Sequence, residues 1–127
     1  MAHSVLGVSV YPLLVVVAAL FGAPTAATAQ ASFDGSWTIL IVTEAGECDR
    51  AYRYGVQIDH GRINYEGGAG VELTGTVDRN GQVSATVQRG GQGAVGTGRL
   101  STNRGRGTWR GKSTTGQCNG YWEAERR

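Results

Sequence analysis

Proline, cysteine and histidine are scarce in this chain. Of its 127 residues, 2 are proline, 2 are cysteine and 2 are histidine, whereas 21 are glycine. Glycine follows no three-residue period, and with so little proline a collagen-like fibre is excluded. Beyond residue 29 no apolar pattern with helical spacing persists, so helices are not expected there. The remaining length suits one small domain, which excludes a two-domain enzyme and a nucleotide-binding βαβ fold.

Charged residues are absent from the first 33 positions. An apolar run over 13–22 is followed by Pro24 and by Ala27-Thr28-Ala29, the small-residue pattern of a signal-peptide cleavage site. We therefore predict a cleavable signal peptide at 1–29 and a single domain at 30–127, although no Lys or Arg precedes the run. A membrane anchor is the alternative, but the run has about half of the ~20 residues that a spanning helix needs. The expected location is periplasmic or secreted, with no membrane span after cleavage.

The two cysteines, Cys48 and Cys118, lie far apart and form no C-x-x-C motif. In an oxidising compartment two isolated cysteines pair with each other, so the sequence predicts a Cys48–Cys118 disulfide. A nucleophilic or metal-binding role for either thiol is the alternative.

The run at 37–43 is rich in β-formers and apolar on both faces. From residue 52 onward apolar and polar residues alternate with a period of two, and glycine-bearing turns interrupt the alternation. This pattern predicts antiparallel strands. The clearest turn signals are His60-Gly61 and Asn80-Gly81, of which the second is the stronger. The expected strands cover 37–43, 52–59, 63–65, 71–78, 83–88, 94–100, 105–112 and 118–125.

Strands in sequence order with short connections predict an all-β fold, an eight-stranded antiparallel up-and-down barrel. A two-sheet β-sandwich is the alternative. In such a barrel the first strand ends, and the last begins, at the same rim, where Cys48 and Cys118 fall. Their disulfide would link the two strands that close the barrel. The glycine-rich loops at 67–70, 90–91 and 114–116 share that rim, where we expect any opening.

The first expected strand opens with a G-x-W motif, Gly35-Ser36-Trp37. At the start of an exported β-meander this motif resembles the opening of lipocalin- and avidin-like barrels of the calycin type. In general type the chain is also similar to small uncharacterised periplasmic β proteins of Gram-negative bacteria. The resemblance implies that a basic residue after the last strand packs over the tryptophan at the closed end; Arg126 holds the matching position, with Arg127 as its substitute. The chain is much shorter than a typical lipocalin, which argues against a roomy cavity.

Catalytic motifs are absent: the chain has no G-x-S-x-G, H-E-x-x-H or P-loop sequence. After residue 29 the sole histidine is His60, in an expected hairpin turn where a solvated side chain is the ordinary role. Carboxylates gather at 44–49 and at Glu123 and Glu125, and the latter pair falls on the solvated face of a strand. We predict a protein that is not an enzyme, with no cofactor and no metal site.

Aromatic residues recur at positions that the alternation assigns to the inner face. Such side chains usually form the core, but around a cavity they would stack on a flat hydrophobic ligand such as haem or a flavonoid-like compound. The expected ligand-binding residues are Trp37, Tyr52, Tyr54, Tyr65, Trp109 and Trp122.

The charge is divided along the chain, with 8 acidic and 3 basic residues at 31–78 and 9 basic and 2 acidic residues at 79–127. One face of a single expected strand carries four cations, Arg104, Arg106, Arg110 and Lys112. Export and strand periodicity argue against nucleic-acid binding by this Arg-Gly pattern. An acidic protein or an anionic envelope surface is the expected partner of this basic face, unless the charges serve solubility alone.

The sequence therefore predicts an exported binding protein that holds a small hydrophobic ligand in the barrel or at its rim. The first alternative is a protein-interaction or inhibitor barrel that acts through its loops and basic face. The second is a structural, envelope-associated protein with no discrete ligand. An enzyme would require His60 and a carboxylate to share a cleft.

Overall fold

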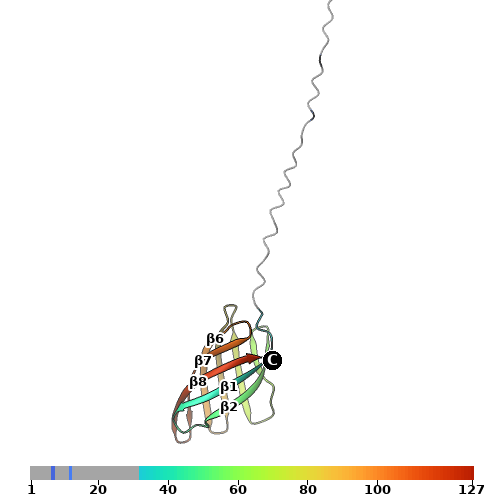
Figure 1. Ribbon diagram of the computed structural model, residues 1–127. Helices are drawn as coiled ribbons and strands as arrows, with labels where there is room; N and C mark the ends of the chain where they lie inside the picture. The colour runs from blue at the N-terminus through green and yellow to red at the C-terminus, as the bar shows by residue number, and fades with distance from the viewer. Residues whose placement is uncertain (1–6, 8–11, 13–31) are drawn as a thin grey trace, which may run out of the picture.

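The computed structural model describes Gly7, Pro12 and residues 32–127, so the predicted signal peptide otherwise lies outside the described residues. Residues 32–127 form a closed antiparallel barrel in which each strand pairs with its neighbours in sequence order (Figure 1). The predicted eight-stranded up-and-down barrel is confirmed, and the alternative sandwich is excluded. Among the described residues no helix could cross a membrane. The strands are β1 (Gly35–Ala45), β2 (Ala51–Asp59), β3 (Arg62–Tyr65), β4 (Val71–Val77), β5 (Gln82–Arg89), β6 (Gln92–Leu100), β7 (Arg104–Ser113) and β8 (Gly116–Arg126).

The two ends of the barrel carry different connections. We call the end with residues 32–34, the turns at 60–61, 78–81 and 101–103, and the C-terminus the Trp37 rim. The opposite end, with the loops at 46–50, 66–70, 90–91 and 114–115, is the disulfide rim. β1 and β8 close the barrel side by side, with Trp37 opposite Arg126 and Ala45 opposite Asn119 (Figure 1).

Both predicted hairpin turns form, but the second is longer than a two-residue turn. His60 and Gly61 both have positive φ, 49° and 77°, as a tight two-residue hairpin requires. At the next turn only Gly81 has positive φ, and the Gly81 N–H donates to the Asp78 carbonyl. The Asp78 carboxylate also accepts the N–H groups of Asn80 and Gln82, at 2.8 and 2.9 Å. An aspartate that caps its own turn therefore sets this loop.

Glycines face the interior of β6, β7 and β8, where tryptophan rings lie over them. Gly98 pairs with Gly107, and Gly107 pairs with Trp122 on the next strand. A Cβ on either glycine would lie 2.5 Å from the Trp122 ring, so only glycine leaves room for that ring. Indoles over inward glycines bury apolar area while the strands stay close together.

The buried Trp109 and Trp122 rings also satisfy their polar atoms. The Trp122 Nε1–H donates to the Thr97 carbonyl at 3.1 Å, and the Trp109 Nε1–H donates to the Val42 carbonyl at 2.9 Å. No buried side-chain nitrogen or oxygen within residues 32–127 lacks a partner. The rings therefore add apolar burial without an uncompensated donor.

The predicted disulfide is present, with Cα atoms 6.0 Å apart. Cys118 is buried in β8, and half-buried Cys48 lies in the loop after β1. The bond ties the loop after β1 to β8, the strand that pairs with β1 to close the barrel, and is consistent with an oxidising, exported compartment.

Removal of the disulfide should lower the free energy of unfolding by about 4 kcal/mol, because the linked cysteines are 70 residues apart. Urea unfolding of the oxidised protein, the reduced protein and the Cys48→Ala/Cys118→Ala double variant measures the difference. Equal midpoints for the three samples would mean that strand pairing alone closes the barrel.

Gly107→Ala should destabilise the fold by about 1–3 kcal/mol, since its Cβ would overlap the Thr97 carbonyl oxygen and the Trp122 ring. Gly68→Ala is the matched control, because no atom lies within 4 Å of a Cβ built there. Thermal unfolding followed by near-UV circular dichroism measures both variants. If the two variants lose the same amount of stability, the contact with Trp122 does not require glycine at position 107.

Candidate functional site

The Trp37 rim is sealed by a basic residue over an indole, as the resemblance implied. Trp37 is 1% exposed, and the Arg126 guanidinium carbon lies 4.7 Å from the centre of its ring. That guanidinium donates to the carbonyls of Ser32, Asp34 and Thr102 at 2.8, 2.6 and 3.0 Å. Charge-assisted bonds to two backbone segments, 32–34 and 101–103, hold this end of the barrel shut.

Arg127 has a different role from its predicted one as substitute for Arg126. Its guanidinium donates to the Trp37 carbonyl at 3.1 Å and forms an ion pair with Glu66 at 2.6 Å. Arg127 thus fastens the C-terminus across β1 and β2 to the end of β3.

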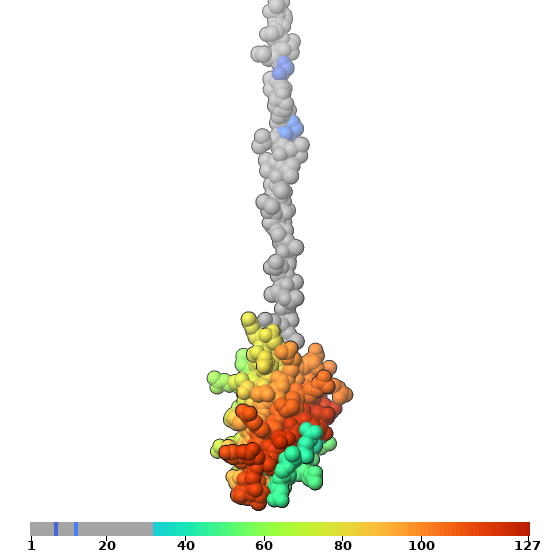
Figure 2. Space-filling model, turned by 90° about the vertical axis from the view of Figure 1, so that its left-hand side faces the viewer, coloured from blue at the N-terminus to red at the C-terminus, as the bar shows by residue number. Residues whose placement is uncertain are grey.

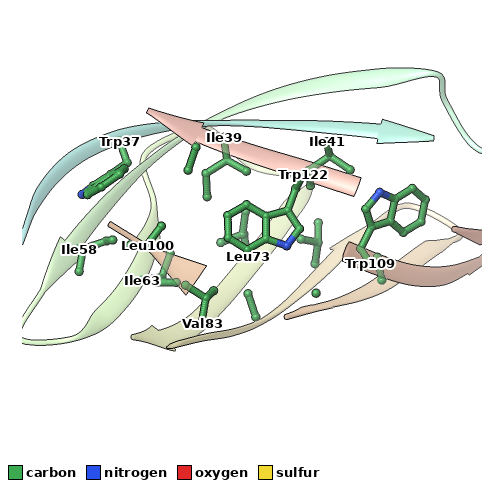
Figure 3. A pocket seen from close by; sticks show the side chains of 15 residues that line it. Trp37, Ile39, Ile41, Ile58, Ile63, Leu73, Val83, Leu100, Trp109 and Trp122 are labelled. Atoms are coloured by element: carbon green, nitrogen blue, oxygen red, sulfur yellow. The ribbon is translucent and has the colours of Figure 1, made fainter. Parts of the chain in front are cut away.

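An apolar cavity of about 50 Å³ lies inside the barrel. Trp37 stands at one end and Trp109 at the other, with the Trp122 ring between them (Figure 3). No lining side chain is charged, and among the lining side chains only the tryptophan indoles carry a polar atom. The lining residues are Trp37, Ile39, Ile41, Ile58, Ile63, Leu73, Val83, Ala85, Val87, Ala94, Gly96, Leu100, Trp109, Trp122 and Ala124.

A second cavity of about 50 Å³ adjoins the first at the disulfide rim. The two share four lining residues, Ile41, Val87, Ala94 and Trp109. The rim cavity also has polar lining, from Thr43, Asp49, Tyr52, Tyr54, Arg89 and Gln92. An apolar chamber and an amphipathic cavity at the rim, which we call the mouth, therefore lie next to each other.

The loop at 46–50 folds over this mouth. The Thr43 hydroxyl donates to the Asp49 carbonyl at 2.6 Å, and the Asp49 carboxylate pairs with Arg89 at 3.4 Å. Cys48 ties the same loop to β8. The opening expected at the disulfide rim is therefore a narrow one, covered by a tethered loop.

Three tyrosines line the side wall near the mouth, beside short β3. Tyr52 and Tyr54 are stacked with ring centres 5.9 Å apart, and Tyr65 meets Tyr54 edge-on at 5.7 Å. β3 ends at Tyr65, which pairs with Val56 of β2. The part of β2 that precedes Val56 and carries Tyr52 therefore has no strand partner on that side. Tyrosine rings, rather than backbone bonds, cover this stretch of wall.

The structure brings most of the predicted ligand-binding residues together. Trp37, Trp109 and Trp122 line the interior cavity, and Tyr52 and Tyr54 line the rim cavity, which Trp109 also reaches. Tyr65 lines neither cavity and packs behind Tyr54. Sequence reasoning missed Arg89, whose guanidinium carbon stands 3.8 Å from the centre of the Tyr52 ring. The alternation of β5 assigned that strand's inner face, but it gave no sign that its last residue stacks on a tyrosine.

The basic face lies apart from the cavities, on the outside of β7. Arg104, Arg106, Arg110 and Lys112 are all exposed. Arg104 pairs with Glu125 of β8 at 3.2 Å, and Glu123 lies opposite Arg106. Glutamates of the neighbouring strand therefore offset part of the positive charge.

His60 contacts a carboxylate but shares no cleft with it. Its Nδ1 lies 2.6 Å from Asp59 Oδ1, and the two side chains are 91% and 68% exposed. The ligand atoms of Asp34, Asp59 and His60 lie within 4.8 Å of one another, a spacing that could hold a divalent cation. All three are exposed on the Trp37 rim, so no chemistry is directed into the barrel.

Comparison with protein-family models, curated proteins and solved structures found no match for this chain. The resemblance to lipocalin- and avidin-like barrels therefore stays a prediction from the sequence.

Stability should fall as the pH rises above 10, with Tyr54 as one cause. Burial, with Tyr65 and Asp49 nearby, raises the pKa of Tyr54 above the usual 10.0. The unfolded chain then loses its phenol proton first, so its contribution is complete below pH 10 and declines at higher pH. Tyr54→Phe should flatten this decline in urea unfolding series, whereas Tyr121→Phe on the outer face of β8 should leave it in place. An equally steep decline in Tyr54→Phe would exclude Tyr54 as a cause.

Proposed function

We propose that the protein binds a small, mostly apolar ligand inside the barrel and catalyses no reaction. The observation that carries this proposal is the apolar interior chamber joined to a polar mouth. The interior offers no acid, base or nucleophile to a reacting group, which supports binding rather than catalysis.

The size of the chambers restricts the ligand. Pockets for drug-sized molecules have about 300–1,000 Å³, and an apolar cavity of about 150 Å³ holds benzene. With about 50 Å³ in each chamber, the interior as it stands has no room for haem or a flavonoid-like compound. The ligand is therefore compact or slender, with an apolar part beside Trp122 and a polar end beside Asp49 and Arg89.

Export to the periplasm or the extracellular space belongs to the same proposal. The disulfide and the uncharged leader sequence support this location. A protein there would meet small apolar molecules before they enter the cell.

Titration with xenon, n-butanol and butyrate tests the proposal, with benzene, palmitate and haem as oversized probes. We expect saturable shifts of the methyl resonances of Ile39 and Leu73, which line the interior, with millimolar dissociation constants. Ala94→Phe, at the junction of the two chambers, should weaken binding about tenfold or more, because the ring fills the space.

Val95→Phe is the matched control, since Val95 is the next residue of β6 and is 45% exposed on the outer face. Ala85→Val, a smaller change within the interior lining, replaces Ala94→Phe if that variant does not fold. The absence of saturable methyl shifts with every compact probe would overturn the proposal, as would equal losses in the Ala94 and Val95 variants.

A protein-interaction barrel is the second candidate, favoured by the exposed cations of β7. Arg106, Arg110 and Lys112 take part in no ion pair within residues 32–127. They lie outside the barrel, so an acidic partner could dock there whether or not the interior is occupied. A structural role with no ligand remains the alternative to both candidates.

A further inference from the structure

The register of β6 and β7 places two arginines directly opposite each other. Arg99 pairs with Arg106, and both side chains are exposed on the outer face. It is the only directly opposed pair of cations in the ladders of residues 32–127. Like charges directly across two strands repel each other, and they destabilise a sheet unless a counter-charge lies between them.

Neither arginine is neutralised by a protein carboxylate. Within the described residues the guanidinium groups of Arg99 and Arg106 take part in no ion pair and no hydrogen bond, whereas Arg104 is held by Glu125. Glu123 lies across from Arg106 but forms no ion pair with it. The Arg99–Arg106 pair thus has two free sets of N–H donors that face the same space.

Polar side chains surround the two guanidinium groups in a hollow of the outer wall. The hollow contains Arg99 and Arg106, and its floor is the backbone of Gly98 and Gly107. The other outward side chains that line it are Gln82, Thr97, Thr108, Tyr121 and Glu123. In Figure 2 this part of the wall belongs to the orange and red surface of β6 to β8, beside the cyan-to-green surface of β1 and β2.

Hydroxyl donors stand next to the arginines in the same register. Thr97 pairs with Thr108 two residues along from the arginine pair, and Tyr121 is opposite Thr108. Gln82 is opposite Arg99 on the other side. Two forked cations with neighbouring hydroxyl and amide donors suit a tetrahedral oxyanion, which can accept several hydrogen bonds at once.

We propose that Arg99 and Arg106 form a binding site for a phosphate or sulfate group, carried by a small molecule or by a lipid headgroup. The site is independent of the interior ligand, because it lies on the opposite face of the same strands. Of the four residues of the basic face, the site uses Arg106 alone, and it adds Arg99 from β6. Glu123, the one carboxylate in the hollow, opposes anion binding and limits the affinity.

Titration of the protein with inorganic phosphate, at constant ionic strength, tests the site through the side-chain Nε–Hε resonances of its arginines. We expect saturable shifts for Arg99 and Arg106 and none for Arg110. Arg106→Gln should weaken phosphate binding about tenfold through the loss of charge-assisted bonds. Glu123→Gln should strengthen it several-fold, since the repelling charge is removed.

Thermal unfolding in phosphate and in chloride gives a second readout. Phosphate stabilises proteins in general, so the comparison needs a variant with the same loss of charge. Arg99→Gln/Arg106→Gln should lose the additional stabilisation by phosphate, whereas Arg110→Gln/Lys112→Gln on the same outer face should retain it. In chloride, Arg99→Gln should be at least as stable as the parent protein, because a repulsion is relieved.

Vesicles of phosphatidylcholine with and without phosphatidic acid distinguish the two sources of the phosphate group. Arg-dependent binding to the phosphatidic acid vesicles supports a lipid headgroup, and binding of free phosphate alone supports a small molecule. The proposal is overturned if phosphate shifts neither arginine in a saturable way, or if both double variants respond to phosphate as the parent protein does.

Discussion

The close approach of β6, β7 and β8 across inward glycines is the constraint on which the rest of this barrel depends. Gly98 faces Gly107, and the Trp122 ring occupies the space that their side chains would need. Trp109 likewise lies opposite Gly96 and Gly120 on its two neighbouring strands. This chain has few large apolar residues, and it fills its core by placing a small number of indole rings over inward-facing glycines.

The same constraint determines which face of β7 carries the charged side chains. Inward glycines and a tryptophan leave only the outer face for charge, so Arg104, Arg106 and Arg110 point to solvent. An Arg-Gly pattern that is typical of disordered RNA-binding segments is here a strand of a small barrel. Because Gly98 and Gly107 form a pair, Arg99 and Arg106 must also do so one position away in each strand. The tight interior and the opposed cations outside therefore have one cause.

Much of the fold follows from local signals in the sequence. Alternation indicated most of the strands and their inner faces, although the first strand is apolar on both faces. The places of Cys48 and Cys118 indicated closure. Contacts between side chains far apart in the sequence had no such signal. The stacking of Arg89 on Tyr52 and the ion pair between Arg89 and Asp49 depend on how the loop at 46–50 folds over the rim. The opposition of Arg99 and Arg106 depends on strand register, which follows from turn geometry. The volume of the cavity depends on side-chain packing, which no pattern of polarity specifies.

The two rims differ in the kind of bond that closes them, and this difference indicates the path of any ligand. At the Trp37 rim Arg126 binds three backbone carbonyls and covers a buried indole, so opening would break these bonds and expose the Trp37 ring. At the disulfide rim, side-chain contacts of Asp49 and stacked tyrosines cover the mouth, and partly exposed ion pairs of this kind contribute little stability. We therefore expect local opening to occur most readily at the disulfide rim. The disulfide limits how far the loop at 46–50 can move. Under the proposed function, a slender molecule would therefore enter at this mouth while the barrel stays closed.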